Sequence, residues 1–239
     1  MSQEIFERYE KKYMVTERQH ELLCRHLKGR MVMDEYGRHT ISNIYFDTDD
    51  FELIRISNEK PEYKEKLRLR AYGAVHKEST VFLELKKKYA GIVYKRRVSL
   101  SLEEAENYLY RGMVPPVNNQ IFREIDYAVR LYGLKAAAAV AYDRRAYYGL
   151  EDGELRITFD EKIRCRQKEL HLNYGPVGTE ILPPGYLLME VKIPGAMPLW
   201  LSHLFSELAI YPVSFSKYGT YYQNVLCRNG NMEGGRICA

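Results

Sequence analysis

The sequence predicts an α+β fold, mainly antiparallel, in which eight strands close into a β-barrel tunnel with flanking helices. Three observations lead to this prediction. Strand-like segments alternate apolar and polar residues, short turns join several of these segments, and charged residues recur along one face of strand after strand. Eight strands are about enough to close a barrel around a small ligand. The same segments exclude a simple helical bundle but leave open a two-layer α+β sheet.

The predicted strands are rich in Val, Ile, Tyr, Thr and Phe and show a period of two residues. Turns at Gly73 and Gly91 join neighbouring segments closely, which favours antiparallel pairing. We expect strands near residues 6–15, 41–47, 64–73, 79–88, 92–100, 138–149, 154–161 and 186–193.

Capping residues mark the expected helices. Thr16 with Gln19, and Ser101 with Glu104, have the spacing of a capping box. Gly133 is placed to end a helix that runs over residues 119–131. Two more helices are expected over residues 198–208 and 217–227. We expect a single tunnel-barrel domain over residues 1–228 and a flexible, Gly-rich tail over residues 229–239.

Composition narrows the function classes. The chain has 239 residues, is 46% hydrophobic and carries a net charge of only +4, so a packed core is expected and a nucleic-acid partner is not. The four cysteines and six histidines lack the spacing of a zinc site or a disulfide framework, which suits a reduced, cytoplasmic protein. The N-terminus does not resemble a signal peptide, and no apolar run predicts direct membrane insertion. A membrane-protein partner and the oligomeric state stay open.

Charged residues recur at every second position of the predicted strands. Residues i and i+2 share one face of a strand, and Arg68 with Arg70 and Glu84 with Lys86 show this spacing. The intervening residues of four segments are apolar, so one face packs against helices and the other is charged. On the charged face ten basic residues outnumber four acidic ones by six, whereas the whole chain carries +4. The basic set is Lys12, Arg68, Arg70, Lys86, Lys95, Arg97, Arg144, Arg156, Lys192 and Lys217, and the acidic set is Glu10, Glu84, Asp160 and Glu190.

Basic side chains that are brought close together repel one another unless an anion offsets the cost. The planar fork of arginine suits phosphate oxygens, and lysine supplies a compact charge. A single charged pair is typical of a solvated open sheet, but the repetition over many strands favours a tunnel that binds a linear chain of phosphates.

Nine short segments, in order along almost the whole chain, resemble a known family. They are Tyr9–Val15, Ile44–Thr48, Lys66–Arg70, Glu84–Lys86, Tyr94–Arg97, Tyr142–Ala146, Arg156–Asp160, Met189–Lys192 and Ser214–Tyr218. The sequence resembles the triphosphate tunnel metalloenzymes (the CYTH-like superfamily) and, more closely, the VTC domain, which is the polyphosphate polymerase domain of the vacuolar transporter chaperone complex.

The resemblance implies metal-dependent phosphoryl transfer in which the γ-phosphate of ATP is polymerised into polyphosphate, with Mn²⁺ or Mg²⁺ as cofactor and with ATP and polyphosphate or triphosphate as partners. It implies catalytic roles for Arg68, Arg70, Lys86 and Lys217. It implies phosphate binding by Lys12, Lys95, Arg97, Arg144, Arg156, Lys192 and Ser216. Glu190 is the first expected metal ligand, and Glu10 and Glu84 are further candidates, as is Asp160.

Two positions depart from the family pattern. Hydrolytic members of the superfamily begin with Glu-x-Glu-x-Lys, whereas the corresponding residues here are Arg8, Glu10 and Lys12. Ser214 stands where a further basic residue is expected in the eukaryotic polymerases. Hydrolysis must activate a neutral water, whereas a phosphate acceptor is already anionic. Loss of the first carboxylate therefore favours a polymerase over a triphosphate or polyphosphate hydrolase, and a non-catalytic polyphosphate- or nucleotide-binding module is the third alternative.

Overall fold

A computed structural model describes residues 9–90, 92–193 and 195–226. The residues form two compact units. The first comprises residues 1–39, 142–163 and 182–215, and the second comprises residues 40–141, 164–181 and 216–239, as far as they are described. The single domain over residues 1–228 stays a prediction. Arg8, the turn at Gly91 and the tail over residues 229–239 lie outside the described residues.

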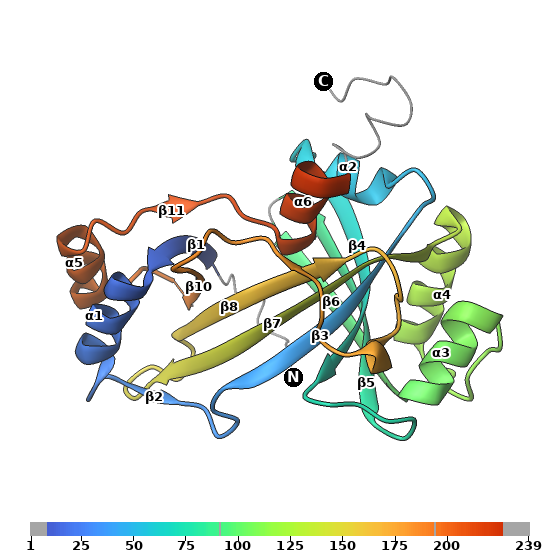
Figure 1. The fold of residues 1–239 in the computed structure, drawn as a ribbon, viewed down its shortest axis with the longest axis horizontal. Helices are drawn as coiled ribbons and strands as arrows, with labels where there is room; N and C mark the ends of the chain where they lie inside the picture. Colours follow the sequence, from blue (N-terminus) through green and yellow to red (C-terminus); the bar gives the residue numbers. More distant parts are fainter. Residues whose placement is uncertain (1–8, 91, 194, 227–239) are drawn as a thin grey trace. The chain divides into compact units, whose positions relative to one another are not determined.

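The strands form an antiparallel sheet of 11 strands in the order β11-β1-β10-β8-β7-β3-β4-β5-β6, while β2 pairs with β7 and β9 pairs with β8 (Figure 1). The strands are β1 (Tyr9–Thr16), β2 (Met31–Met33), β3 (His39–Asp47), β4 (Tyr63–Tyr72), β5 (Thr80–Tyr89), β6 (Ile92–Ser101), β7 (Lys135–Gly149), β8 (Arg156–Arg166), β9 (Thr179–Glu180), β10 (Tyr186–Ile193) and β11 (Pro212–Val213).

The predicted closed, eight-stranded barrel is wrong. In the part of the chain that the structure describes, the strand order ends at β11 and β6, and these two strands do not pair with each other. Closure depends on which strands become neighbours, and the alternation within one strand does not encode its partner. At one end of the order, β11 is two residues long, and its Pro212 has no N–H to donate to a further strand.

All eight predicted strands are present. Residues 6–8 of the first one lie outside the described residues, and the largest shift is in β8, which runs to Arg166 instead of residue 161. The prediction missed β2, β9 and β11, because strands of two or three residues are too short to show a period.

In the first unit, the apolar faces of β1, β8 and β10 form one core. Val15, Ile157 and Val191 are fully buried there. Helices α1 (Glu17–Leu27) and α5 (Leu199–Glu207) contribute Leu23 and Leu201 to the same cluster. The predicted capping box at the start of α1 is confirmed, with side-chain bonds in both directions. The opposite face of these strands is left to polar residues.

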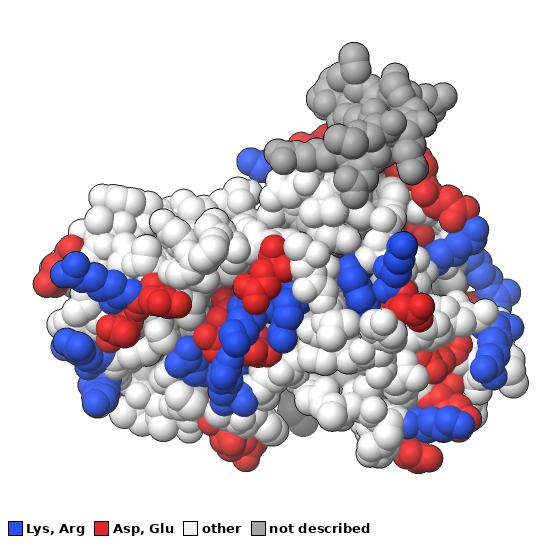
Figure 2. Space-filling view, in the orientation of Figure 1, with Lys and Arg blue, Asp and Glu red and all other residues white. Residues whose placement is uncertain are grey.

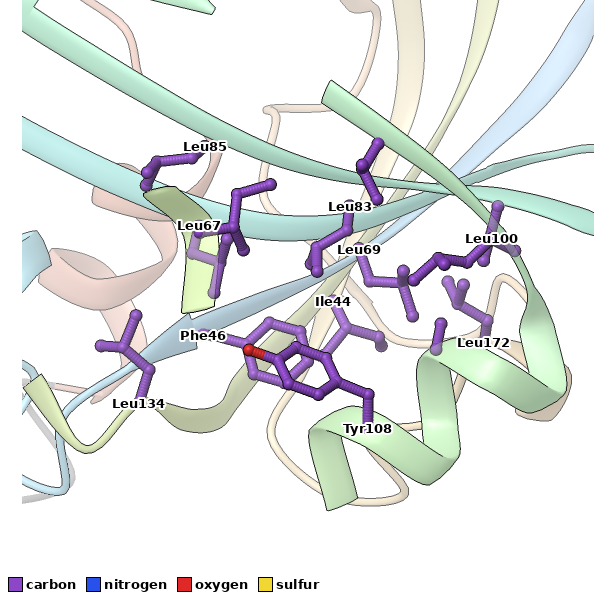
Figure 3. Close-up of a cluster of buried hydrophobic side chains, with 14 of the residues drawn as sticks. Ile44, Phe46, Leu67, Leu69, Leu83, Leu85, Leu100, Tyr108, Leu134 and Leu172 are labelled. Carbon is purple, nitrogen blue, oxygen red and sulfur yellow. The ribbon is translucent and has the colours of Figure 1, made fainter. Parts of the chain in front are cut away.

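In the second unit, β3, β4, β5 and β6 pack their apolar faces on α3 (Leu102–Arg111) and α4 (Gln120–Tyr132). Figure 3 shows Leu67, Leu69 and Leu83 from the strands close to Tyr108 from α3. The predicted α4 is confirmed: Asn119 caps its start, and Gly133 ends it with φ +59°. This core fixes which strand face is left for charged residues.

Four further helical segments are described in the second unit. Helix α6 (Lys217–Tyr221) continues as a π-helix over Tyr222–Leu226, close to the predicted helix at residues 217–227. The sequence contains no local capping signal for α2 (Glu52–Asn58), because the side chain of its N-cap residue, Phe51, makes no capping hydrogen bond. Asp47, at the end of β3, caps the helix instead, because its carboxylate accepts hydrogen bonds from the amides of Leu53 and Ile54. A 3₁₀ turn, η1, covers Leu172–Tyr174.

Replacing Ser101 with alanine should lower the free energy of unfolding by about 1 kcal/mol. The Ser101 hydroxyl accepts a bond from the Glu104 amide, while the Glu104 carboxylate accepts one from the Ser101 amide. Urea unfolding checks this, with Ser99→Ala as a control because Ser99 is exposed on the same strand. Equal stability of the Ser101 and Ser99 variants would contradict the role of the cap.

Among the described residues, the helices are too short or too polar for any of them to cross a membrane.

Candidate functional site

In the second unit, the strand register brings the predicted basic residues onto one face. Arg68 on β4 lies opposite Glu84 on β5, and Glu84 lies opposite Arg97 on β6. Lys86 lies opposite Lys95 in the next pair of the same face. Cross-strand partners have Cβ atoms roughly 5 Å apart. The alternation in sequence therefore becomes a patch of charge, because the apolar residues between these positions are held by the helices on the other face.

Glu84 is the centre of this patch and is only 1% exposed. Its carboxylate accepts bonds from Nε of Arg68 at 2.8 Å and from Nε of Arg97 at 2.7 Å. Nζ of Lys95 lies 2.8 Å from it, and Nε of Arg70 lies 3.8 Å away. We call Glu84 with these four basic residues the Glu84 cluster. Four basic groups around one carboxylate leave a net charge of +3.

Glu84 stays ionised at neutral pH. Burial alone would raise its pKa, but the guanidinium groups of Arg68 and Arg70 and the ammonium group of Lys95 outweigh burial and hold the pKa far below its ordinary value. Both carboxylate oxygens already accept bonds from basic groups. Glu84 is thus suited to hold four basic side chains in place. These contacts favour that role over the predicted role of Glu84 as a metal ligand.

Neutral side chains on β3 and β5 also contact the arginines of the Glu84 cluster. The Tyr45 hydroxyl accepts a bond from Arg68 at 3.3 Å, and the Asn43 carbonyl accepts one from Nε of Arg70 at 3.0 Å. The Phe82 ring lies 4.3 Å from the Arg97 guanidinium. Asn43, Tyr45 and Phe82 were not predicted as site residues. Asn43 and Tyr45 lie at positions i and i+2 on β3, opposite Arg70 and Arg68. This spacing is the signal that could have found them.

Ser216 and Lys217, at the start of α6, belong to the same unit. The Ser216 hydroxyl accepts a bond from Nζ of Lys66 at 3.1 Å and one from the Gly219 amide at 3.2 Å. Lys217 is 8% exposed. Since α6 has only five residues, its dipole adds little to phosphate binding. The Tyr218 ring stacks on Tyr45 with centroids 4.9 Å apart, which ties α6 to β3.

The first unit holds a second group of predicted residues. Arg144 donates two bonds to Asp160, at 2.6 and 2.7 Å, and a third to Glu190 at 3.3 Å. Nζ of Lys12 lies 3.6 Å from Glu190 and 3.9 Å from Glu10. We call these five residues the Asp160 cluster. Three carboxylates against two basic groups give it a net charge of −1, the opposite sign to that of the Glu84 cluster.

Arg144 is permanently charged in this surrounding. Burial alone would lower its pKa, but Tyr142, Asp160 and Glu190 outweigh burial and raise the pKa above its ordinary value. Asp160 is fully buried, so the paired bonds from Arg144 compensate a charge that water cannot reach.

Arg156 and Lys192 lie at the ends of the strands of the first unit. Glu10 lies opposite Lys192, which in turn lies opposite Arg156. Arg156 is exposed and Lys192 is half-buried. They share the polar face with the Asp160 cluster, as the spacing of two residues predicted.

Residues of the first unit fit a divalent metal. Among the described residues, no group of three or more His, Cys, Asp or Glu side chains is arranged to hold a metal ion. Mg²⁺, however, needs only one or two protein carboxylates and takes its other ligands from water and substrate phosphates. The buried hydroxyl of Thr158 has no hydrogen-bond partner among the residues that the structure describes, and Thr158 lies directly opposite Glu190. An unpartnered oxygen donor beside a buried carboxylate suits a hard cation. The third expected ligand, Glu84, belongs to the second unit and is not part of this set.

Charges of both signs lie on the surface elsewhere. Figure 2 shows acidic side chains set among basic ones over β7 and β8. Glu161 on β8 pairs with Arg145 on β7, at 3.3 Å, and with Arg38, which directly precedes β3, at 2.7 Å. The visible face of β7 and β8 therefore has no extended region of one sign.

The model of one protein family, described as VTC domain, matches residues 7–226. The chain therefore belongs to the VTC domain family, and the predicted resemblance is confirmed. A comparison with curated proteins found no match.

Three solved structures are similar to this chain over most of its length. A protein from Bacillus halodurans, described as a "putative adenylate cyclase", is similar with a TM-score of 0.53 and 18% identity, over 87% of this chain and 92% of that chain. A protein from Vibrio parahaemolyticus with the same description has a TM-score of 0.46 and 11% identity, over 89% and 96% of the two chains. A protein from Pyrococcus horikoshii has a TM-score of 0.46 and 12% identity, over 90% and 99%. The first similarity shows a shared fold.

Proposed function

We propose that this protein polymerises the γ-phosphate of ATP into inorganic polyphosphate in the cytoplasm, with a divalent metal as cofactor. Membership of the VTC domain family supports a function on nucleoside triphosphates or polyphosphate. The Glu84 cluster is the observation that carries the proposal, because its charge of +3 is fixed on one sheet face and suits a polyanion.

In this proposal the Glu84 cluster binds and aligns the phosphates. Arg68 and Arg70 are already held by Glu84 and by their neutral partners on β3, so little reorganisation is needed when phosphate charge shifts during transfer. A terminal oxygen of the polyphosphate attacks the γ-phosphorus of ATP. The bond from that phosphorus to the bridging oxygen breaks, ADP leaves with the electron pair, and the polymer gains one phosphate. The attacking oxygen is anionic, so no general base is required.

Glu190, with Thr158 beside it, would hold the metal in the first unit, and Glu10 is a further carboxylate near Lys12. When bound, the ion supplies neutralisation of charge on phosphate oxygens. Arg144 and Lys12 hold the Glu190 carboxylate in position.

Replacing Glu190 with alanine should lower activity by about 10- to 100-fold and flatten its dependence on manganese concentration. The loss is incomplete because water and phosphate oxygens can supply the remaining ligands. Initial rates over a range of manganese concentrations measure this, with the exposed Glu180→Ala on β9 as the control. An unchanged manganese dependence in the Glu190 variant would rule out its role as a ligand.

Incubation of the full chain with ATP, manganese and a short polyphosphate primer tests the proposed reaction. ³¹P NMR separates the signals of internal phosphates, orthophosphate and ADP. Growth of the internal-phosphate signal, matched by ADP, is the expected result. Release of orthophosphate without polymer would identify a hydrolase, and triphosphate binding without turnover would identify a binding module. Either outcome would overturn the proposal.

A further inference from the structure

Lysines stand opposite lysines on β4 and β5, beyond the Glu84 cluster. On the face that carries Glu84, Lys66 lies opposite Lys86, and Lys64 lies opposite Lys88. Going from Arg68 toward the start of β4, the face therefore changes from arginines around a carboxylate to pairs of lysines. We call Lys64 and Lys88 the lysine pair.

The lysine pair destabilises the folded protein when no anion is bound. Like charges directly opposite each other destabilise an antiparallel sheet. Burial, together with the ammonium groups of Lys88 and Lys60, lowers the pKa of Lys64. Both members of the pair are half-buried, so water screens their repulsion incompletely. Nζ of Lys64 donates to the Ser57 carbonyl at 3.0 Å, which fixes its position without neutralising its charge.

Among the described residues, no carboxylate pairs with Lys64 or Lys88. Over the described ranges 9–90, 92–193 and 195–226, neither Lys64 nor Lys88 forms a salt bridge. The neighbouring residue on the opposite face behaves differently, because Lys87 pairs with Glu65 at 3.3 Å. Within the part of the chain that the structure describes, Lys87 therefore has an acidic partner and the lysine pair has none.

We propose that Lys64 and Lys88 form a second phosphate subsite, which holds the polyphosphate chain beyond the phosphates at the Glu84 cluster. This inference rests on the proposed function. Lys64 precedes Arg68 by four positions, which is about 13 Å along an extended strand. A triphosphate whose phosphates are all held by the Glu84 cluster does not extend to the lysine pair, whereas a longer chain reaches both. The lysine pair therefore favours long chains over short ones.

Binding of two anions to the full chain tests the subsite. The probes are tripolyphosphate and a polyphosphate of defined length, several times longer, titrated by calorimetry. In the double variant Lys64→Gln/Lys88→Gln, affinity for the long chain should fall about tenfold, while affinity for tripolyphosphate stays within about twofold. The salt dependence of long-chain binding should also weaken, because fewer counterions are released. The variant Lys77→Gln/Lys87→Gln removes the same charge from an exposed turn and from the opposite face, and it should leave both affinities unchanged.

Three outcomes would overturn the subsite. Unchanged long-chain affinity in the Lys64/Lys88 variant, an equal loss for both anions, or an equal loss in the control variant would each do so. Wild-type protein that binds neither anion would instead refute the proposed function, and the subsite with it. Folding is checked by thermal unfolding, in which the Lys64/Lys88 variant should be at least as stable as the wild type because repulsion has been removed.

Discussion

Replacing Arg68 or Arg70 with alanine is expected to lower phosphoryl transfer at least about 100-fold while the fold survives. Each change removes a guanidinium group that is fixed in the Glu84 cluster before substrate binds. Three basic groups would still surround the buried Glu84 carboxylate in either variant, so its charge stays compensated. Initial rates of polymer formation and thermal unfolding measure the two effects.

Two further variants make this prediction specific. Arg68→Lys keeps the charge but loses the two bonds that Arg68 makes to Glu84, so its activity should lie between those of the wild type and Arg68→Ala. Arg96→Ala is the matched control, since Arg96 is on β6 but points to the other face, where it pairs with Glu124 at 3.0 Å. Near-normal activity of Arg68→Ala and Arg70→Ala would contradict a role of the cluster in catalysis.

Replacing Glu84 with glutamine should lower the free energy of unfolding by about 3 kcal/mol at neutral pH, the low end of the range for breaking a buried ion pair. The value is at the low end because Lys95 and Arg97 are partly exposed and are screened by water. Without the carboxylate, four basic groups remain with no negative charge at their centre. Urea unfolding measures the loss, and tripolyphosphate should recover part of it by replacing the missing negative charge.

The effect of Glu84→Gln should depend on pH with a definite sign. The pKa of Glu84 is lower in the folded protein than in the unfolded chain, so ionised Glu84 stabilises the fold above its unfolded pKa of about 4.3. This stabilisation is lost as the pH falls below that value. The difference between wild type and variant should therefore be constant near neutral pH and shrink toward pH 3. The exposed Glu62→Gln is the control, with an expected change within about 0.5 kcal/mol. A Glu84 variant as stable as this control would show that the carboxylate does not hold the cations together.

Local structure could be predicted from the sequence because its signals are local. Alternation along each strand located the eight longer strands, and Thr16, Ser101 and Asn119 marked three helix starts. Barrel closure could not be predicted in this way, since it depends on which strands lie at the ends of the order. Helix α2 was missed because its capping side chain, Asp47, comes from the preceding strand.

The members of the Glu84 cluster were predicted, but not its organisation. A spacing of two residues places Arg68, Arg70 and Glu84 on one face without saying which carboxylate meets which cation. Only the register of three strands sets Glu84 between Arg68 and Arg97 and makes it a partner of basic groups. Glu190 has the same spacing in the sequence, yet it lies opposite Lys12 and Thr158 in a cluster of opposite charge.

Titration of tripolyphosphate into the full chain, followed by calorimetry at several salt concentrations, is the most direct test of the Glu84 cluster as a phosphate site. We expect binding that weakens steadily as the salt concentration rises. Affinity should fall at least tenfold in Arg70→Gln, because the neutral amide of glutamine does not replace the charge of the guanidinium group. Absence of binding at low salt, or equal affinity of wild type and Arg70→Gln, would contradict the assignment of phosphate binding to these residues.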